Sequence, residues 1–201
     1  ALPISLRDFV GSSPLGDTRA TPPSIIAVVK ANAYGHGAVP VSRALERAGA
    51  TMLACADIEE AIVLRTGGVT APILVFGALS VSDLDGLFEY SLTPTISTPG
   101  AAKAVAAAAA RRKKAIAFHL KIDTGMNRLG FRHDNLRRTL PEVLSNPGLH
   151  LEAAFTHFAT ADVPGHALFN DQRARFESAT DRKSTRLNSS HVSESRMPSS
   201  A

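Results

Sequence analysis

The chain lacks tryptophan, has a single cysteine, and only 5% of its 201 residues are aromatic. One cysteine excludes an internal disulfide and is typical of a reducing compartment, so we expect a cytoplasmic location. Cys55 lies in an apolar run at residues 52–56, which predicts a buried thiol rather than a nucleophile. With 44% hydrophobic and 20% charged residues, the composition is that of an ordinary globular domain.

Long hydrophobic runs and metal-binding spacings are absent as well. No apolar stretch approaches the ~20 residues that cross a bilayer. The first four residues, 1–4, show no charged region leading into a long apolar segment, so neither a membrane span nor an export signal is expected. No closely spaced pair of histidines or cysteines occurs, and we expect no metal site.

A net charge of +4 raises the question of nucleic-acid binding. Residues 181–201 contribute four basic and two acidic side chains, which leaves 18 against 16 in the rest of the chain. The densest basic run, residues 111–114, ends an alanine-rich segment that starts with Thr98 and Pro99, a typical helix start. Cations in a last helical turn face the negative end of its dipole, and no aromatic residues are interleaved for base stacking. We therefore expect no nucleic-acid partner.

The last 21 residues differ from the rest of the chain. They contain seven serines and no periodic apolar pattern, which predicts disorder. Residues 181–191 resemble the translation of a sequencing adapter, and residues 1–4 resemble the end of its partner. We interpret residues 5–180 as one partial domain and residues 181–201 as a non-native tail.

Between the two ends, strand and helix patterns alternate. Apolar runs predict strands at residues 24–29, 51–56, 72–76, 92–96, 115–122 and 149–156. Helical spacing and cap residues predict helices at residues 39–48, 57–65, 82–89, 99–112, 135–144 and 167–177. Strict alternation predicts an α/β fold with parallel strands, either an open doubly wound sheet or about six of the eight βα units of a (β/α)8 TIM-type barrel. Because no Gly-x-Gly-x-x-Gly follows the first strand, we favour the partial barrel.

Lys30 directly follows the first predicted strand, where active sites of such folds lie. A lysine in a partly buried site can have a lowered pKa and attack a carbonyl as a Schiff-base lysine does. The residues after it, 31–37, are small and turn-forming, and they include Tyr34. The alternative is a strand-end lysine whose amine reaches water.

The fifth and sixth predicted strands carry further polar candidates. His119, Lys121 and Asp123 alternate with apolar residues and so share one face, which would point into a barrel. Arg128 follows in the next loop, where it could grip a carboxylate. His157 follows the sixth strand and could pack on a cofactor ring. A salt-bridged outer face for the strand residues, and a structural role for the histidine, stay open as alternatives.

Three of these segments resemble blocks of the alanine racemase family. They are AVVKANAYGHG at residues 27–37, HLKIDTGMNRLGF at residues 119–131 and FTHFATAD at residues 155–162. The resemblance covers about residues 24–178 and includes the family's cofactor-lysine signature. It implies an eight-stranded α/β barrel that binds pyridoxal 5'-phosphate, a following β domain missing from this chain, and a homodimer.

The resemblance also implies roles for individual residues. Lys30 would hold the cofactor and act as the base on one face of the substrate α-carbon. Tyr34 would bond the cofactor phosphate, and His157 would lie beside the pyridine ring. Arg128 would hold the substrate carboxylate and approach the ring hydroxyl. Lys121, a candidate N6-carboxylysine, would orient Arg128.

The activity implied is the interconversion of L-alanine and D-alanine, which supplies D-alanine for peptidoglycan. The second base would be a tyrosine from the β domain of the other subunit, outside this chain, so the chain alone is expected to be inactive. Two alternatives remain: a non-catalytic barrel protein that carries pyridoxal phosphate, and a racemase for another amino acid such as serine.

Overall fold

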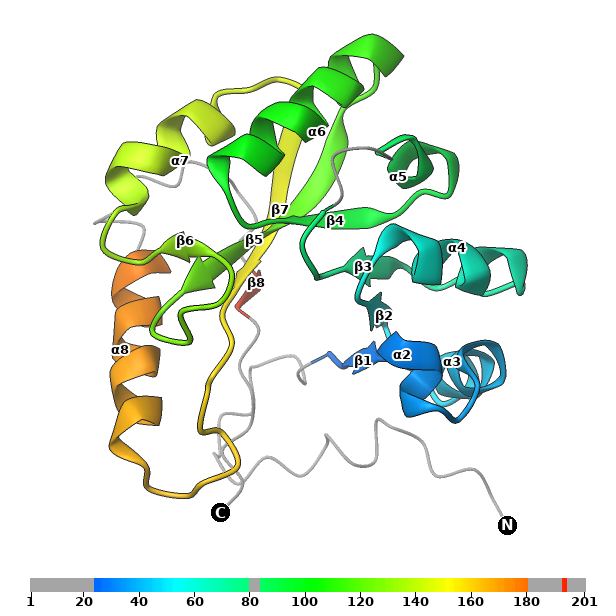
Figure 1. The fold of residues 1–201 in the computed structure, drawn as a ribbon, viewed down its shortest axis with the longest axis horizontal. Helices are drawn as coiled ribbons and strands as arrows, with labels where there is room; N and C mark the ends of the chain where they lie inside the picture. Colours follow the sequence, from blue (N-terminus) through cyan, green and yellow to red (C-terminus); the bar gives the residue numbers. More distant parts are fainter. Residues whose placement is uncertain (1–23, 80–83, 181–192, 195–201) are drawn as a thin grey trace, which may run out of the picture. The chain divides into compact units, whose positions relative to one another are not determined.

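The computed structural model describes residues 24–79, 84–180 and 193–194. These residues fall into two compact units (Figure 1). Residues 24–77 and 85–93 lie in the first unit, and residues 78–79, 84, 94–180 and 193–194 in the second. Residues 5–23 and most of 181–201 lie outside the described residues, so the predicted domain boundaries stay predictions.

The first unit contains three parallel strands in chain order. Strand β1 (Ile26–Val28) pairs with β2 (Met52–Cys55), which pairs with β3 (Ile73–Val75). The helical segments of this unit are α2 (Lys30–Tyr34), α3 (Ala38–Arg47), α4 (Ile58–Thr66) and α5 (Asp85–Glu89). The core is formed by strand and helix side chains that are at most 1% exposed, among them Leu53, Leu64 and Ile73. Burial raises the pKa of the Cys55 thiol to about 12, so this buried thiol stays protonated.

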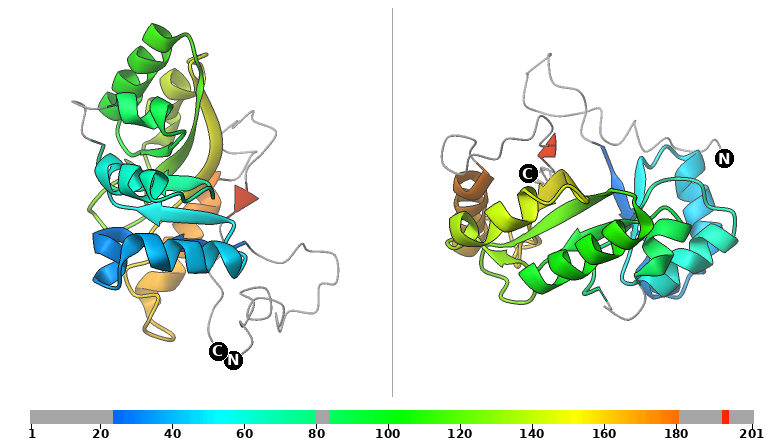
Figure 2. Two further views of the ribbon diagram at one scale, coloured as in Figure 1. Left: turned by 90° about the vertical axis from the view of Figure 1, so that its right-hand side faces the viewer. Right: turned by 90° about the horizontal axis from the view of Figure 1, so that it is seen from above.

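The second unit contains the longer strands. In chain order it has β4 (Thr93–Ile96, starting at the unit boundary), α6 (Pro99–Arg112), β5 (Ile116–Asp123), β6 (Phe131–Arg132), α7 (Leu136–Leu144), β7 (Leu149–Phe155), α8 (Ala167–Thr180) and β8 (Ser193–Glu194). Strand β5 pairs in parallel with β4 on one side and β7 on the other, and β6 pairs with its end. Helices α6 and α7 pack against β7 and against each other (Figure 2).

Two helix starts follow from local sequence. The Asp57 carboxylate accepts a hydrogen bond from the Glu60 backbone N–H at 2.8 Å, which caps α4. The Thr98 hydroxyl accepts one from the Ala101 N–H at 3.1 Å, and Pro99 follows it in the first turn of α6. The helix starts predicted near residues 57 and 99 are both confirmed.

The predicted α/β alternation is confirmed, with every assigned strand pairing parallel among the described residues. Strands follow chain order in each unit, as in a barrel, and the reversal of order that marks a doubly wound sheet is not seen within either unit. The sequence did not predict β6 or β8. The latter lies in the tail expected to be disordered, where Ser193 and Glu194 pair with β7. Within the described ranges, no helix is both long and apolar enough to cross a bilayer.

Candidate active site

Lys30 opens a turn of unusual handedness at the end of β1. The four residues after it have φ angles of 50°, 55°, 54° and 53°, all in the left-handed region, and none of them is glycine. Each such residue costs roughly 1–2 kcal/mol relative to a right-handed conformation. Strain of this kind persists only where surrounding contacts impose it, and it is concentrated at functional sites.

Glu60 supplies a side-chain contact that supports this turn, which four backbone hydrogen bonds within residues 29–37 also hold. One oxygen of its carboxylate accepts the backbone N–H of Ala31 at 2.7 Å, and the other accepts that of Ala56 at 2.8 Å. The Asn32 side chain closes the far end by accepting the N–H of Ala38 at 2.7 Å. A single carboxylate from α4 therefore joins the Lys30 turn to the end of β2.

Glu60 was not among the predicted site residues, although the sequence carries a signal for it. Asp57 and Glu60 have the spacing of a capping box, in which the second residue reaches back to the N-terminus of its own helix. Here the Glu60 side chain bonds the N–H of Ala56, one residue before the cap, and also reaches Ala31. The spacing predicts the local bond, and the contact across 29 residues could not be read from it.

Lys30 is half-buried, and its amine lies near two aromatic rings. It lies 5.7 Å from the centre of the Phe76 ring and 5.9 Å from that of Tyr34. Among the described residues it forms no ion pair with a carboxylate. The Tyr34 side chain is 61% exposed, so its hydroxyl is accessible to a ligand. An amine without a carboxylate partner, next to an accessible hydroxyl, fits an aldehyde that carries a phosphate.

The polar face of β5 lies in the second unit. Lys121 is 9% exposed, and its amine lies 4.4 Å from the centre of the Phe155 ring on the neighbouring strand β7. Burial, aided by the nearby Arg128 guanidinium and opposed by Asp123, lowers the pKa of Lys121 to about 8. His119 is also buried, and burial lowers its pKa against the opposing effect of Glu152 at 3.6 Å.

The loop that carries Arg128 is folded around Asp123. The Asp123 carboxylate accepts the backbone N–H groups of Gly125 at 3.0 Å and Asn127 at 3.1 Å. Gly130 then has a φ of +132°, and a Cβ there would lie 2.6 Å from the Asp123 nitrogen. Only glycine fits this close approach. The Arg128 side chain is exposed at the surface of this loop.

His157 follows β7, and its side chain is exposed. Its carbonyl oxygen accepts a hydrogen bond of 3.0 Å from the Gln172 side chain of α8. The structure thus places Lys30 and Tyr34 together in the first unit, and Lys121, Arg128 and His157 in the second. That all five form one site stays a prediction.

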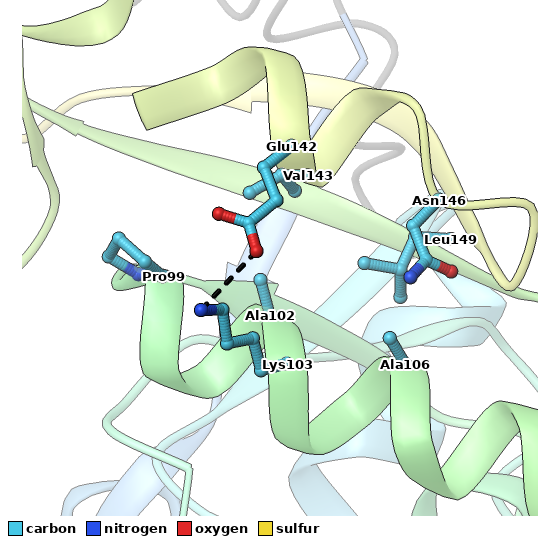
Figure 3. Close-up of a pocket in the computed structure, with 8 residues that line it drawn as sticks. All are labelled: Pro99, Ala102, Lys103, Ala106, Glu142, Val143, Asn146 and Leu149. Atoms are coloured by element: carbon cyan, nitrogen blue, oxygen red, sulfur yellow. Dashed lines mark ion pairs between the residues drawn. The ribbon is translucent and has the colours of Figure 1, made fainter. Parts of the chain in front are cut away.

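A shallow pocket on the second unit contains none of these residues. It lies between α6 and α7, as Figure 3 shows, and its rim carries an ion pair of 3.3 Å between Lys103 and Glu142. The two side chains are 69% and 70% exposed, so solvent screens the pair. This pocket is a surface feature of the helix layer.

A family model described as "Alanine racemase, N-terminal domain" matches residues 17–197. The chain belongs to this family. Its barrel domain accounts for the alternating strands and helices, and the family resemblance of the sequence blocks around Lys30, Lys121 and His157 is confirmed at the level of the domain.

Relatives in the alanine racemase family cover most of this chain. An alanine racemase of Desulforamulus reducens is 44% identical over 153 residues, which are 76% of this chain and 41% of that protein. The solved alanine racemase of Clostridium difficile 630 superposes with a TM-score of 0.77 at 32% identity, over 85% of this chain and 45% of the other. A solved histidine racemase of Leuconostoc mesenteroides has a TM-score of 0.72 at 33% identity, over 79% and 43%. The chain spans about two fifths of the length of the relatives it matches in sequence.

Proposed function

We propose that the whole protein containing this chain is a pyridoxal-phosphate-dependent alanine racemase. The observation that carries the proposal is the Lys30 amine, held by a strained left-handed turn at the end of β1 beside an accessible tyrosine. The family membership and the 44% identity to an alanine racemase support the choice of reaction. We also propose a cytoplasmic location, in line with the single buried thiol.

Four residues of this chain would contact the cofactor or the substrate. Lys30 would hold the cofactor through its amine, and Tyr34 would donate its hydroxyl to the phosphate. His157 would lie beside the pyridine ring, and Arg128 would bind the substrate carboxylate through its guanidinium. When bound, pyridoxal phosphate supplies an electron sink that makes the α-hydrogen of an amino acid acidic. Lys30 would then take or return that proton on one face of the α-carbon.

Lys121 would carry an N6-carboxyl group, and in that form it would orient Arg128. The neutral amine would form a bond to the carbon of CO₂ and release a proton to solvent, which converts a neutral side chain into an anion. A pKa of about 8 supports this, because an ordinary lysine keeps far less neutral amine near neutral pH. The resulting negative charge beside Arg128 would replace the present repulsion between the two side chains with attraction.

Racemisation requires a base on each face of the α-carbon, and this chain offers Lys30 for one of them. We propose that a tyrosine from the β domain of a second subunit supplies the other, so that the active form is a homodimer and this chain alone is inactive.

The test is the formation of D-alanine from L-alanine by the full-length protein. Borohydride reduction of the protein loaded with pyridoxal phosphate, followed by peptide mass mapping, should place the label on Lys30. A protein that holds the cofactor without forming D-alanine would overturn the alanine assignment and leave the two alternatives, a non-catalytic carrier and a racemase for another amino acid. A label on another lysine would overturn the assignment of the site.

Another amino acid is the alternative to alanine as the substrate. The likeness to a histidine racemase, at 33% identity, favours testing a second amino acid in the same fold. The assay should therefore compare L-alanine, L-serine and L-histidine. The alanine assignment requires the highest kcat/KM for alanine.

A further inference from the structure

Gln172 is the most completely buried large polar side chain in the second unit. It lies on α8 and is 0% exposed, yet its amide has a partner for each of its polar groups. Its nitrogen donates to the His157 carbonyl oxygen at 3.0 Å and to the Thr124 hydroxyl at 3.3 Å. Its oxygen accepts the Ala159 backbone N–H at 2.9 Å. A buried amide that satisfies both donors and its acceptor is rigidly held.

These bonds connect two loops that leave different strands. Thr124 follows β5 and begins the loop to Arg128, whereas His157 and Ala159 follow β7. The Thr124 hydroxyl is also 2.8 Å from that of Thr156, which lies just before His157. Gln172 therefore crosslinks the start of the Arg128 loop with the backbone of His157.

Arg175, one turn further along α8, strengthens the same connection. Its guanidinium donates to the Thr124 carbonyl oxygen at 2.9 Å. Thr124 is thus held through its side chain by Gln172 and through its backbone by Arg175. Thr124 is 0% exposed, and its bond to Gln172 is buried, whereas the bond from Arg175 is partly buried.

We propose that Gln172 is a positioning residue that sets the separation between the Arg128 loop and His157. The inference rests on the proposed function, in which Arg128 binds the substrate carboxylate and His157 lies beside the cofactor ring. Its effect would be transmitted through Thr124 and through the carbonyl of His157. Gln172 itself touches neither substrate nor cofactor in this account. The turn that holds Lys30 has a separate support in Glu60, so the amine should not depend on Gln172.

The experiment replaces Gln172 in the full-length protein with methionine, which has a similar volume and forms none of the three bonds. We expect the KM for L-alanine to rise and kcat/KM to fall roughly 10- to 100-fold, as for an ångström-scale displacement of a binding group. The fraction of Lys30 labelled by pyridoxal phosphate and borohydride should stay at the wild-type level. Hydrogen exchange of the peptide that spans residues 124–128 should become faster.

Two further variants keep the test interpretable. Asn170→Asp alters an exposed amide on the same helix and should behave as the wild type. Thr124→Val removes the bridging hydroxyl while keeping the side-chain shape, and it should reproduce the KM effect should Gln172→Met fail to fold. The inference is overturned if KM and loop exchange stay within about twofold of wild type in a folded Gln172 or Thr124 variant. An inactive wild-type protein would instead overturn the proposed function, and exchange of the loop would still report whether Gln172 holds it.

Discussion

Replacing Glu60 with glutamine should loosen the turn that carries Lys30. The carboxylate accepts two backbone N–H groups, of Ala31 at 2.7 Å and of Ala56 at 2.8 Å. A glutamine amide has one acceptor oxygen, so one of these bonds would be replaced by an NH₂ group that faces an N–H. A hydrogen bond to a charged group is worth about 1.5–3 kcal/mol. The half-buried position of Glu60 favours the lower end of this range.

The free energy of the lost bond is comparable with the strain of one left-handed residue of the turn. Each left-handed residue from Ala31 to Tyr34 costs about 1–2 kcal/mol. Four backbone hydrogen bonds within residues 29–37 and the Asn32 side chain also support the turn, but Glu60 is its link to the second strand. A loss of about 1.5 kcal/mol shifts the population of the ordered turn roughly tenfold. We therefore expect slower reaction of Lys30 with pyridoxal phosphate by a similar factor, together with a lower free energy of unfolding.

The assay measures borohydride-trapped label on the Lys30 peptide against time, and urea unfolding of the same samples. Glu59→Gln is the matched control, because Glu59 is exposed in the same first turn of α4. Equal labelling rates and equal unfolding midpoints for the two variants would refute the role given to Glu60. A slower labelling of Lys30 in Glu60→Gln at an unchanged unfolding midpoint would show that the substitution affects only the turn.

The remaining predictions concern three other residues. Lys30→Ala should abolish the borohydride-trapped label and reduce racemisation by at least about a thousandfold, measured as D-alanine formed, since a covalent anchor and a base are lost together. At a fixed concentration of dissolved CO₂, N6-carboxylation of Lys121 should increase as the pH rises through its pKa of about 8, because only the neutral amine reacts. ¹³C NMR with labelled bicarbonate measures the carboxylation, and the Lys121→Arg variant should show no signal. Gly130→Ala should lower the free energy of unfolding by about 1–3 kcal/mol or more, through a Cβ placed 2.6 Å from the Asp123 nitrogen. Gly165 also has a positive φ, but a Cβ there would meet open space. The Gly165→Ala variant in the same urea titration therefore reports the backbone strain without the clash.

Local sequence signals account for most of the fold. Apolar runs bounded by Asp57 or Thr98 are sufficient to predict strand ends and helix starts, because a cap and the turn that it bonds lie within four residues. The alternation of His119, Lys121 and Asp123 likewise predicts a polar face of β5, since side chains of a strand alternate by geometry.

The site depends on contacts that sequence reasoning does not provide. Ala31 and Ala33 belong to the residue type with the highest right-handed helix propensity, and yet both adopt the left-handed conformation. The backbone N–H of Ala31 is held by Glu60, which is 29 residues further along the chain. Gln172 bonds Thr124 across 48 residues for the same kind of reason. Polar contacts between distant segments have no period in the sequence, and only the folded chain reveals them.

The bridge formed by Glu60 would make the proposed reaction of Lys30 with its cofactor sensitive to the correct pairing of β1 with β2. Ala31 belongs to the first βα unit, whereas Ala56 and Glu60 belong to the second. A slip of β1 against β2 by one residue would move Ala31 by about 3.3 Å and separate it from the carboxylate. A mispaired chain would then fail to present its lysine, so uptake of the aldehyde would serve as a checkpoint for the folding of this part of the chain.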